Sequence, residues 1–306
     1  MRIYVAGHNG LVGRSLTRAI DARDDCTWMG ETRSELDLLD SAAVSQYVKT
    51  NSPDVMVIAA AKVGGIGAND KFPVEFLLEN LGIQNNLISA AHKFGTKKVI
   101  FLGSSCIYPK HCDQPIKEEY LLTGPLEPTN EAYAIAKIAG LKLIQSYRKE
   151  YGHKWISVMP TNLYGPDDNF DPSTSHVLPA MIAKFHKAKV ESNSQVELWG
   201  TGKPMREFLH VDDLAEAVLV LNQEYDDMSP INVGTGIEIE IAKLAAIVAQ
   251  IVGYSGEIVW NSQMPDGTPR KVLDISKISA LGWVPKIDLY EGISQVYESF
   301  KLNQPA

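Results

Sequence analysis

The sequence predicts an α/β fold in which a parallel sheet carries helices on both faces. Three observations predict it: a glycine-rich turn follows the first short apolar run, further apolar runs alternate with longer helical patterns, and small or polar residues stand where the runs end. Right-handed crossovers between such runs give a doubly wound sheet, whose ligands bind beyond the carboxyl ends of the strands.

The composition is that of an ordinary globular chain. Of its 306 residues, 45% are apolar and 22% are charged, which suits one large α/β domain or two lobes. The net charge of -8 argues against nucleic acid or an anionic membrane as a partner. Any anionic ligand must therefore be held by a local group of basic side chains.

We expect a cytoplasmic protein without a bound metal. The first strand begins at Arg2, and apolar runs such as residues 55–61 are far shorter than a membrane span. Cys26, Cys106 and Cys112 form no paired framework, which fits a reducing compartment. The seven histidines show no metal-ligand spacing.

The glycine-rich turn predicts dinucleotide binding. Residues 3–6 read as a buried strand, Gly7, Gly10 and Gly13 follow it, and a helix then runs to about Ile20. The first glycine permits the tight turn, the second lets a pyrophosphate approach the backbone, and the third allows close packing of helix on strand. The helix N-terminus offers free N–H groups and a positive dipole end to the phosphates.

The residues at the end of the second strand, which is expected near residues 26–29, distinguish NAD from NADP. An acid there usually binds the ribose 2′-hydroxyl of NAD, whereas an arginine binds the 2′-phosphate of NADP. Both Glu31 and Arg33 are present. Arg33 followed by Ser34 is the better phosphate ligand, so the sequence favours NADP; the alternative is that Arg33 lies on the solvated surface.

The other elements follow from the same alternation. Buried strands are expected at residues 55–59, 98–102 and 155–159, and helices at about 41–50, 73–94 and 131–151. After a polar loop at 167–176, helices are expected at about 178–187, 241–252 and 289–300. Residues 199–208 read as a hairpin, and residues 211–213 as the cap of a further helix.

A tyrosine and a lysine four positions apart suggest acid–base chemistry. Tyr133 and Lys137 fall one turn apart on the same helix face, and the ammonium there favours the phenolate over the phenol. Ser104, at a strand end, could hydrogen-bond a substrate oxygen against the phenol. The set suggests proton transfer at a carbonyl or alcohol, although this tyrosine–lysine spacing also occurs by chance on many helices.

Together these motifs resemble the extended short-chain dehydrogenase/reductase family. Over residues 3 to about 300, the resemblance narrows to members that convert GDP-4-keto-6-deoxy-D-mannose to GDP-L-fucose. The blocks that carry it are residues 103–109, 127–131, 160–166, 175–177 and 205–210. It implies a Rossmann-type NADP-binding domain of residues 1–165 and about 207–232, and a smaller α/β substrate lobe of about 166–206 and 233–306.

The resemblance also implies catalytic roles. Tyr133 protonates the C4 oxygen as NADPH delivers hydride to C4, with Lys137 tuning the phenol and Ser104 hydrogen-bonding the carbonyl. Cys106 and His176 are the acid/base pair that inverts C3 and C5 before reduction. This is chemically reasonable, because a C4 ketone acidifies both neighbouring carbons and inversion needs one group on each face of the ring.

Further residues are implied as ligands. If residues 104–106 stay extended, Ser104 and Cys106 point to the same side and share a pocket. The implied substrate-binding residues, whose cations suit a diphosphate, are Lys184, Trp199, Arg206, Asp266 and Lys271. The implied cofactor-binding residues are Gly7, His8, Asn9, Gly10, Leu11, Val12, Gly13, Arg33, Asp37, Leu38, Leu102, Gly103, Ser104, Ser105, Lys137, Pro160, Asn162, Leu163 and His176.

Two alternatives stay open. A UDP-sugar 4-epimerase that retains NAD would need no second acid/base pair such as Cys106 and His176. A non-catalytic dinucleotide-sensing regulator would have no chemical need for an intact set of serine, tyrosine and lysine. Members of the family are typically homodimers paired through helices near residues 75–94 and 131–150, so a homodimer is expected.

Overall fold

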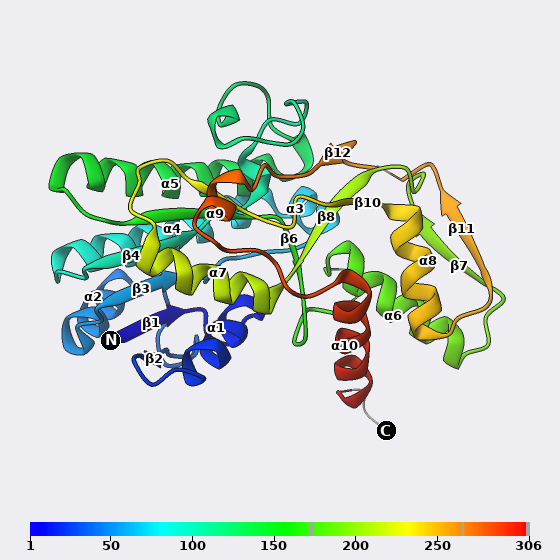
Figure 1. Cartoon of the computed structure of the whole chain (residues 1–306), viewed down its shortest axis with the longest axis horizontal. Helices are drawn as coiled ribbons and strands as arrows, with labels where there is room; N and C mark the ends of the chain where they lie inside the picture. Colours follow the sequence, from blue (N-terminus) through cyan, green and yellow to red (C-terminus); the bar gives the residue numbers. More distant parts are fainter. Residues whose placement is uncertain (172–173, 265, 304–306) are drawn as a thin grey trace.

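The computed structural model describes residues 1–171, 174–264 and 266–303, and a six-stranded parallel sheet organises its first part (Figure 1). The strand order is β2-β1-β3-β4-β5-β9, so the order reverses between β1 and β3. The strands are β1 (Arg2–Ala6), β2 (Thr27–Met29), β3 (Val55–Ile58), β4 (Lys98–Leu102), β5 (Ile156–Pro160) and β9 (Ile231–Val233).

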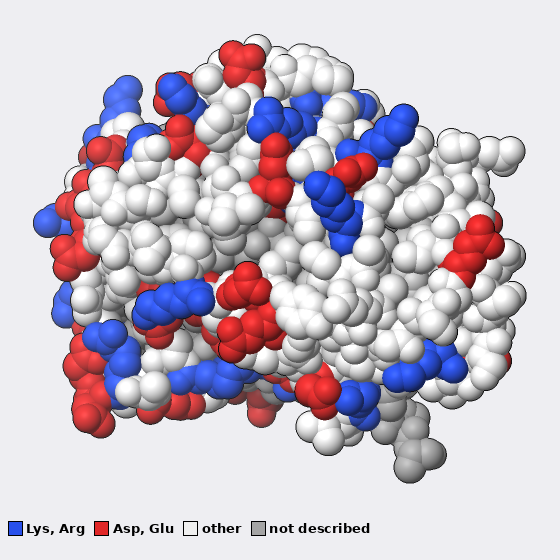
Figure 2. All heavy atoms as spheres, turned by 45° about the vertical axis from the view of Figure 1, so that its right-hand side comes forward, with Lys and Arg blue, Asp and Glu red and all other residues white. Residues whose placement is uncertain are grey.

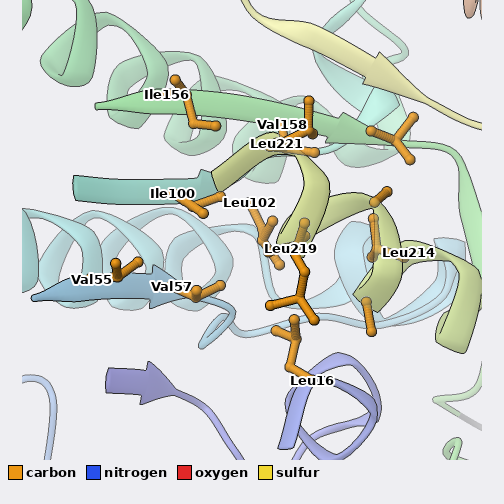
Figure 3. Packing of buried hydrophobic residues seen from close by; sticks show 14 of the residues in the cluster. Leu16, Val55, Val57, Ile100, Leu102, Ile156, Val158, Leu214, Leu219 and Leu221 are labelled. Carbon is orange, nitrogen blue, oxygen red and sulfur yellow. The ribbon is translucent and has the colours of Figure 1, made fainter. Parts of the chain in front are cut away.

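One face of the sheet packs against α1 (Leu11–Asp21) and α7 (Val211–Glu224). Alternate strand residues point to this side, and Val57 and Ile100 meet Leu16 of α1 and Leu214 of α7 there (Figure 3). Segments far apart in the sequence thus share one core.

The opposite face packs against α2 (Ser41–Asn51), α4 (Pro73–Lys93) and α5 (Glu131–Tyr151). Met56 and Phe101, each one position out of phase with the residues of the first core, point to this side. Helices on both faces of a parallel sheet confirm the predicted doubly wound Rossmann-type fold.

A second lobe lies beyond the carboxyl ends of the strands, on the side opposite β2 in Figure 1. Its own core includes Leu178, Phe185, Leu244 and Phe300. Its helices are α6 (Val177–Val190), α8 (Ile241–Val252) and α10 (Leu289–Leu302). β7 (Gln195–Trp199) and β11 (Glu257–Asn261) form a two-stranded sheet of this lobe. β6 (Asn162–Tyr164), β8 (Met205–His210), β10 (Glu238–Glu240) and β12 (Arg270–Lys271) form a second small sheet that links the two parts of the chain.

Residues 199–208 do not form the expected hairpin. β7 pairs in parallel with β11, whereas β8 pairs with β6, β10 and β12. Gly200 and Gly202 both have positive φ and turn the chain from one sheet into the other. The prediction of a hairpin is therefore wrong. β7 and β8 pair with strands that are far away in the sequence and not with each other.

The expected cap of α7 is also wrong in detail. The N-cap is His210, whose Nδ1 accepts a hydrogen bond from the Asp212 N–H at 3.2 Å. The Asp213 carboxylate instead accepts from the backbone N–H groups of Lys286 and Ile287. It ties the helix to a distant loop.

Basic and acidic side chains are mixed on the face shown in Figure 2. They form no continuous basic patch on this face. Within the described part of the chain, no helix combines the length and apolarity needed to cross a membrane. The polar loop expected at residues 167–176 lies partly outside the described residues.

Candidate active site

A cavity of about 870 Å³ runs along the carboxyl edge of the parallel sheet and continues between the two parts of the molecule. Every catalytic, cofactor-binding and substrate-binding residue expected from the sequence lines it. Its position at the reversal of strand order is where α/β sheets bind their ligands.

The glycine turn forms the floor of one end of this cavity. Gly7 has φ of +90°, and a Cβ placed on it would lie 2.7 Å from the Ala60 nitrogen. A Cβ on Gly13 would lie 2.0 Å from the Gly7 carbonyl oxygen. The Nδ1 atom of His8 is buried without a partner among the described residues. The close backbone approach and an unpaired polar atom fit a dinucleotide here.

Arg33 stands exposed at the rim of the cavity, next to Glu31 and Asp37. Thr32 and Glu35 fold the turn around it, since the Thr32 N–H donates to the Glu35 carboxylate at 2.9 Å. In the residues that the structure describes, no acid forms an ion pair with Arg33. Its guanidinium can therefore turn to a phosphate without breaking a contact.

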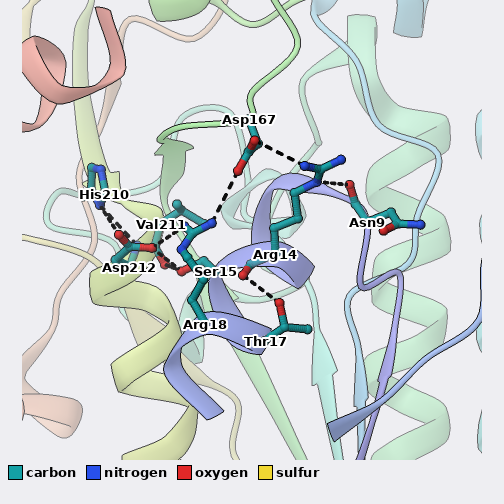
Figure 4. A network of polar contacts seen from close by, with 9 residues as sticks. All are labelled: Asn9, Arg14, Ser15, Thr17, Arg18, Asp167, His210, Val211 and Asp212. Carbon is teal, nitrogen blue, oxygen red and sulfur yellow. Dashed lines mark hydrogen bonds and ion pairs between the residues drawn. The ribbon is translucent and has the colours of Figure 1, made fainter. Parts of the chain in front are cut away.

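An ion-pair network that the sequence did not predict fixes the helix behind the glycine turn (Figure 4). Arg14 and Arg18 of α1 each lie 3.3 Å from a carboxylate oxygen of Asp167, and Arg18 also lies 2.7 Å from Asp212. The Ser15 hydroxyl donates to the same Asp212 carboxylate at 2.5 Å. The only sequence signal is two arginines four apart on one helix face. The network joins α1 to α7 and to the loop that enters the cavity.

Lys137 and Tyr133 occupy one side of the cavity. The Lys137 side chain is 4% exposed, its Nζ donates to the Leu102 carbonyl at 2.9 Å, and burial lowers its pKa to about 8. Burial, together with the charge of Cys106, raises the pKa of Tyr133 against an opposing hydrogen bond from Ser104.

The expectation that the ammonium favours the phenolate is therefore wrong for this arrangement. The Leu102 carbonyl holds the Lys137 ammonium, and desolvation of the phenol dominates. The phenol of Tyr133 is protonated at neutral pH, which is the form that a proton donor needs.

Residues 104–106 do not stay extended, which was the condition for Ser104 and Cys106 to point to the same side. Residues Ser105–Ile107 form a 3₁₀ turn, and the Cys106 N–H donates to the Ser104 hydroxyl oxygen at 3.2 Å. The turn still leaves both side chains on the cavity. The Cys106 sulfur accepts from Asn130 Nδ2 and from Lys271 Nζ, both at 3.4 Å.

The thiol and the imidazole have lowered pKa values for different reasons. Burial raises the pKa of Cys106, but the charge of Lys271 and further contacts outweigh it, so the value falls below that of an ordinary cysteine. His176, at the N-cap of α6, has its pKa lowered by burial and then by Lys271. The imidazole is accordingly neutral at neutral pH.

The second lobe supplies cations and an aromatic wall. Lys184 Nζ donates to the Glu197 carbonyl at 3.2 Å and lies 5.9 Å from the Trp199 ring centroid. Arg206 Nη2 donates to the Asp266 carbonyl at 3.2 Å, and the Asp266 carboxylate accepts from the backbone N–H and the hydroxyl of Thr201. Arg270 does not line the cavity, because it pairs with Glu238 at 2.7 Å. Of that basic pair, only Lys271 faces the site.

Four polar side chains that were not expected from the sequence line the cavity with a buried atom that has no hydrogen-bond partner among the described residues. These atoms are Asn69 Oδ1, Asn130 Oδ1, Asp168 Oδ2 and Ser175 Oγ. Burial raises the pKa of Asp168 to about 7. A polar loop reads as solvated surface, so no sequence signal separated Asp168 from its neighbours. No group of three metal-ligating side chains occurs in the described ranges.

Comparison with known proteins gives consistent matches. The model of the NAD dependent epimerase/dehydratase family matches residues 3–234. A protein named putative GDP-L-fucose synthase 2 from Arabidopsis thaliana is 52% identical over 304 residues, covering 99% of this chain and 92% of that protein. GDP-L-fucose synthase from Escherichia coli K12 is 49% identical over 312 residues, covering 99% and 97%.

A solved structure extends the similarity to a bound cofactor. MlghC, a GDP-mannoheptose C4 reductase from Campylobacter jejuni with NADP bound, superposes with a TM-score of 0.90 at 39% identity. The match covers 98% of this chain and 98% of that chain.

Proposed function

The chain belongs to the NAD dependent epimerase/dehydratase family, and from this premise we propose that it performs the 3,5-epimerisation and 4-reduction of GDP-4-keto-6-deoxy-D-mannose to GDP-L-fucose. It is an NADP-dependent oxidoreductase and epimerase that acts on a nucleotide sugar. Relatives named GDP-L-fucose synthase, 49% and 52% identical over nearly the whole chain, support the substrate. The observation that carries the proposal is one cavity lined by both a tyrosine–lysine–serine set and a cysteine–histidine pair.

NADPH, when bound, supplies hydride to the C4 carbon. The glycine turn holds the pyrophosphate through backbone N–H groups, and Arg33 takes the 2′-phosphate. Asn9 stands in the turn where some family members carry a basic residue, so Arg33 is the main ligand of that phosphate.

For reduction, Tyr133 donates the phenolic proton to the C4 oxygen. Ser104 hydrogen-bonds the same oxygen, and Lys137 anchors the segment through the Leu102 carbonyl. These groups stabilise the charge that develops on the oxygen as hydride arrives.

For epimerisation, Cys106 and His176 act on opposite faces of the hexose. One removes a proton beside the ketone, an enolate forms, and the other returns a proton to the opposite face. Ser104 serves both steps, because both need a polarised C4 carbonyl.

Lys184 and Arg206 bind the diphosphate, and Trp199 and Asp266 line the nucleoside end. We propose the division into an NADP-binding domain of residues 1–165 and about 207–232, with the remainder as the substrate lobe. The packing of α7 and β9 on the parallel sheet supports this division. We further propose a homodimer joined through α4 and α5.

A pure C4 reductase is the alternative, favoured by the likeness to MlghC, which is named for that activity. Such an enzyme has no use for a thiol of lowered pKa in a cavity that a histidine also lines. A sensor without activity is disfavoured by the intact serine, tyrosine and lysine in the cavity.

Two variants separate the two half-reactions. With GDP-4-keto-6-deoxy-D-mannose in D₂O and no NADPH, we expect wild type to incorporate deuterium at C3 and C5, and Cys106→Ser to do so about 10²-fold more slowly or worse. Tyr133→Phe should retain the incorporation yet lose about 10²-fold or more in NADPH oxidation. Mass spectrometry and nicotinamide absorbance measure the two rates.

The opposite result of each experiment would contradict the role assigned to that residue. Wild-type exchange in Cys106→Ser would remove the epimerase role, and full NADPH oxidation in Tyr133→Phe would remove the proton donor. A wild type that reduces the ketone without any deuterium incorporation would be a C4 reductase.

A further inference from the structure

The sulfur of Cys106 receives two N–H donors from separate parts of the chain. Lys271 on β12 and Asn130, the last residue before α5, each place a nitrogen 3.4 Å from Sγ. Cys106 itself sits on a 3₁₀ turn that the Ser104 hydroxyl caps. A neutral thiol needs no such pair of donors, whereas a thiolate is stabilised by both.

Lys271 can donate to the Cys106 sulfur because no described acidic side chain neutralises its ammonium. Within the described residues, no carboxylate forms an ion pair with Lys271, and its Nζ donates to the Cys106 sulfur. The preceding residue, Arg270, points away and pairs with Glu238. Successive side chains of a strand face opposite sides, so Arg270 faces the solvent side and Lys271 faces the thiol.

The other charged and titratable groups around the sulfur come from β8, from α5, from the start of α6 and from two loops. Arg206 on β8 adds positive charge, Tyr133 on α5 is protonated, and His176 at the start of α6 is neutral. Lys110 and Glu127 line a small hollow next to the sulfur, and they neutralise each other at 2.9 Å. The field at the sulfur is therefore positive, and Lys271 is its nearest source.

We propose that Lys271 is a positioning residue for epimerisation: its ammonium, with the amide of Asn130, holds the sulfur of Cys106 as a thiolate that accepts the proton of a carbon beside the C4 ketone. This rests on the function proposed above. It assigns Lys271 to the thiol, whereas sequence resemblance implied a contact with the substrate.

The step balances without another reactant. The C–H bond beside the ketone breaks, an S–H bond forms on Cys106, and the electron pair moves into the enolate, whose oxygen faces Ser104. The neutral imidazole of His176 takes up a proton from solvent and gives it to the opposite face of the enolate, where the new C–H bond forms, and no electrons are gained or lost. The imidazole is then neutral again, and the thiol of Cys106 returns its proton to solvent before the second inversion.

Alkylation of the full-length protein by iodoacetamide tests the pairing without any substrate. The rate at Cys106, followed by peptide mass spectrometry across pH 5–10, reports the fraction of thiolate. We expect Lys271→Met to raise the pKa of Cys106 and thereby to slow alkylation at pH 7 by about tenfold. At a pH below the pKa, an increase of one unit in the pKa lowers the fraction of thiolate tenfold. Lys271→Arg should retain most of the wild-type rate, since it keeps the charge.

Arg270→Gln is the matched control, because it removes the neighbouring cation of the same strand that faces away. It should leave the alkylation profile of Cys106 unchanged. An unchanged profile in Lys271→Met, with a wild-type melting temperature, would overturn the proposal, as would an equal slowing in Arg270→Gln.

A comparison inside the wild type covers the case in which Lys271→Met does not fold. Burial raises the pKa of Cys112, so Cys106 should be alkylated at lower pH than Cys112. The reverse order would overturn the proposal.

The two proposals fail separately. If Lys271→Met shifts the alkylation profile but wild type exchanges no deuterium into the 4-keto sugar, the thiolate pairing stands and the epimerase function falls. If wild type exchanges deuterium but the profile does not shift, the function stands and the role of Lys271 falls. If both hold, the pH profile of exchange in Lys271→Met should move to higher pH together with the alkylation profile.

Discussion

At the scale of single residues, burial acts in opposite directions on the ionisable groups of the cavity. It raises the pKa of Tyr133 and Asp168 and lowers that of Lys137, because each charged form loses hydration. Cys106 departs from this pattern, since nearby positive charge outweighs its burial. A phenol that donates a proton and a thiolate that accepts one can thus share the cavity with Ser104.

The carboxyl of Asp168 should make stability depend on pH. Its folded pKa of about 7 lies above its ordinary value of 3.8. Between these values the unfolded chain releases a proton that the folded chain retains, so the stability from this group is present below pH 3.8 and is lost as pH rises through 7. Asp168→Asn cannot ionise and escapes that loss.

We therefore expect Asp168→Asn to gain stability over wild type as pH rises from 4.5 to 7.5, by on the order of 2 kcal/mol. Denaturant unfolding at several pH values measures the difference. The exposed Asp24→Asn is the control. A constant difference between Asp168→Asn and wild type over this range would contradict the assignment.

At the scale of elements, the glycine turn combines two separate requirements. The third glycine is needed for the fold, because a Cβ on Gly13 would meet the Gly7 carbonyl and the His8 Cα. The second is needed for the ligand, because a Cβ on Gly10 has only the Gly7 carbonyl near it, at 3.4 Å. The backbone of Gly10 is also in an extended region that alanine adopts.

Alanine at these two positions should separate stability from binding. Gly13→Ala should lower the free energy of unfolding by about 1–3 kcal/mol, since backbone atoms must move. Gly10→Ala should melt like wild type but bind NADPH about tenfold more weakly, because its methyl group obstructs the pyrophosphate. Thermal melts and fluorescence titration distinguish them, and equal melting temperatures of the two variants would refute the separation.

At the scale of the whole molecule, α4 and α5 lie side by side and carry large exposed apolar side chains. Val74 and Leu78 of α4 are 66% and 62% exposed, and Ile135 of α5 is 44% exposed. They lie away from the sheet, on the outer side of the layer. An apolar stripe of this kind suits a self-complementary interface between two copies.

The double variant Leu78→Glu and Ile135→Glu should halve the mass in solution. Light scattering after size-exclusion chromatography measures it. Ile237→Glu, at a 73% exposed apolar residue of the other lobe, should remain a dimer. A monomeric wild type, or an unchanged mass in the double variant, would rule out this interface.

By itself the sequence determined the doubly wound sheet and the glycine turn between its first strand and first helix. Strand and helix periodicities are local, and the glycine turn depends on neighbouring residues, so the helix predicted at residues 131–151 and the strand at 98–102 match α5 and β4. The residues expected to be catalytic were located by family blocks, and all of them line one cavity.

Only the tertiary structure decided which groups act on one another. The contact of Lys271 with Cys106 spans 165 positions in the chain, and the Leu102 carbonyl that holds Lys137 lies on another element. The misread hairpin at 199–208 has the same cause. Sheet pairing, desolvation and the field at a sulfur depend on distances between segments that are remote in sequence, and no local pattern encodes those distances.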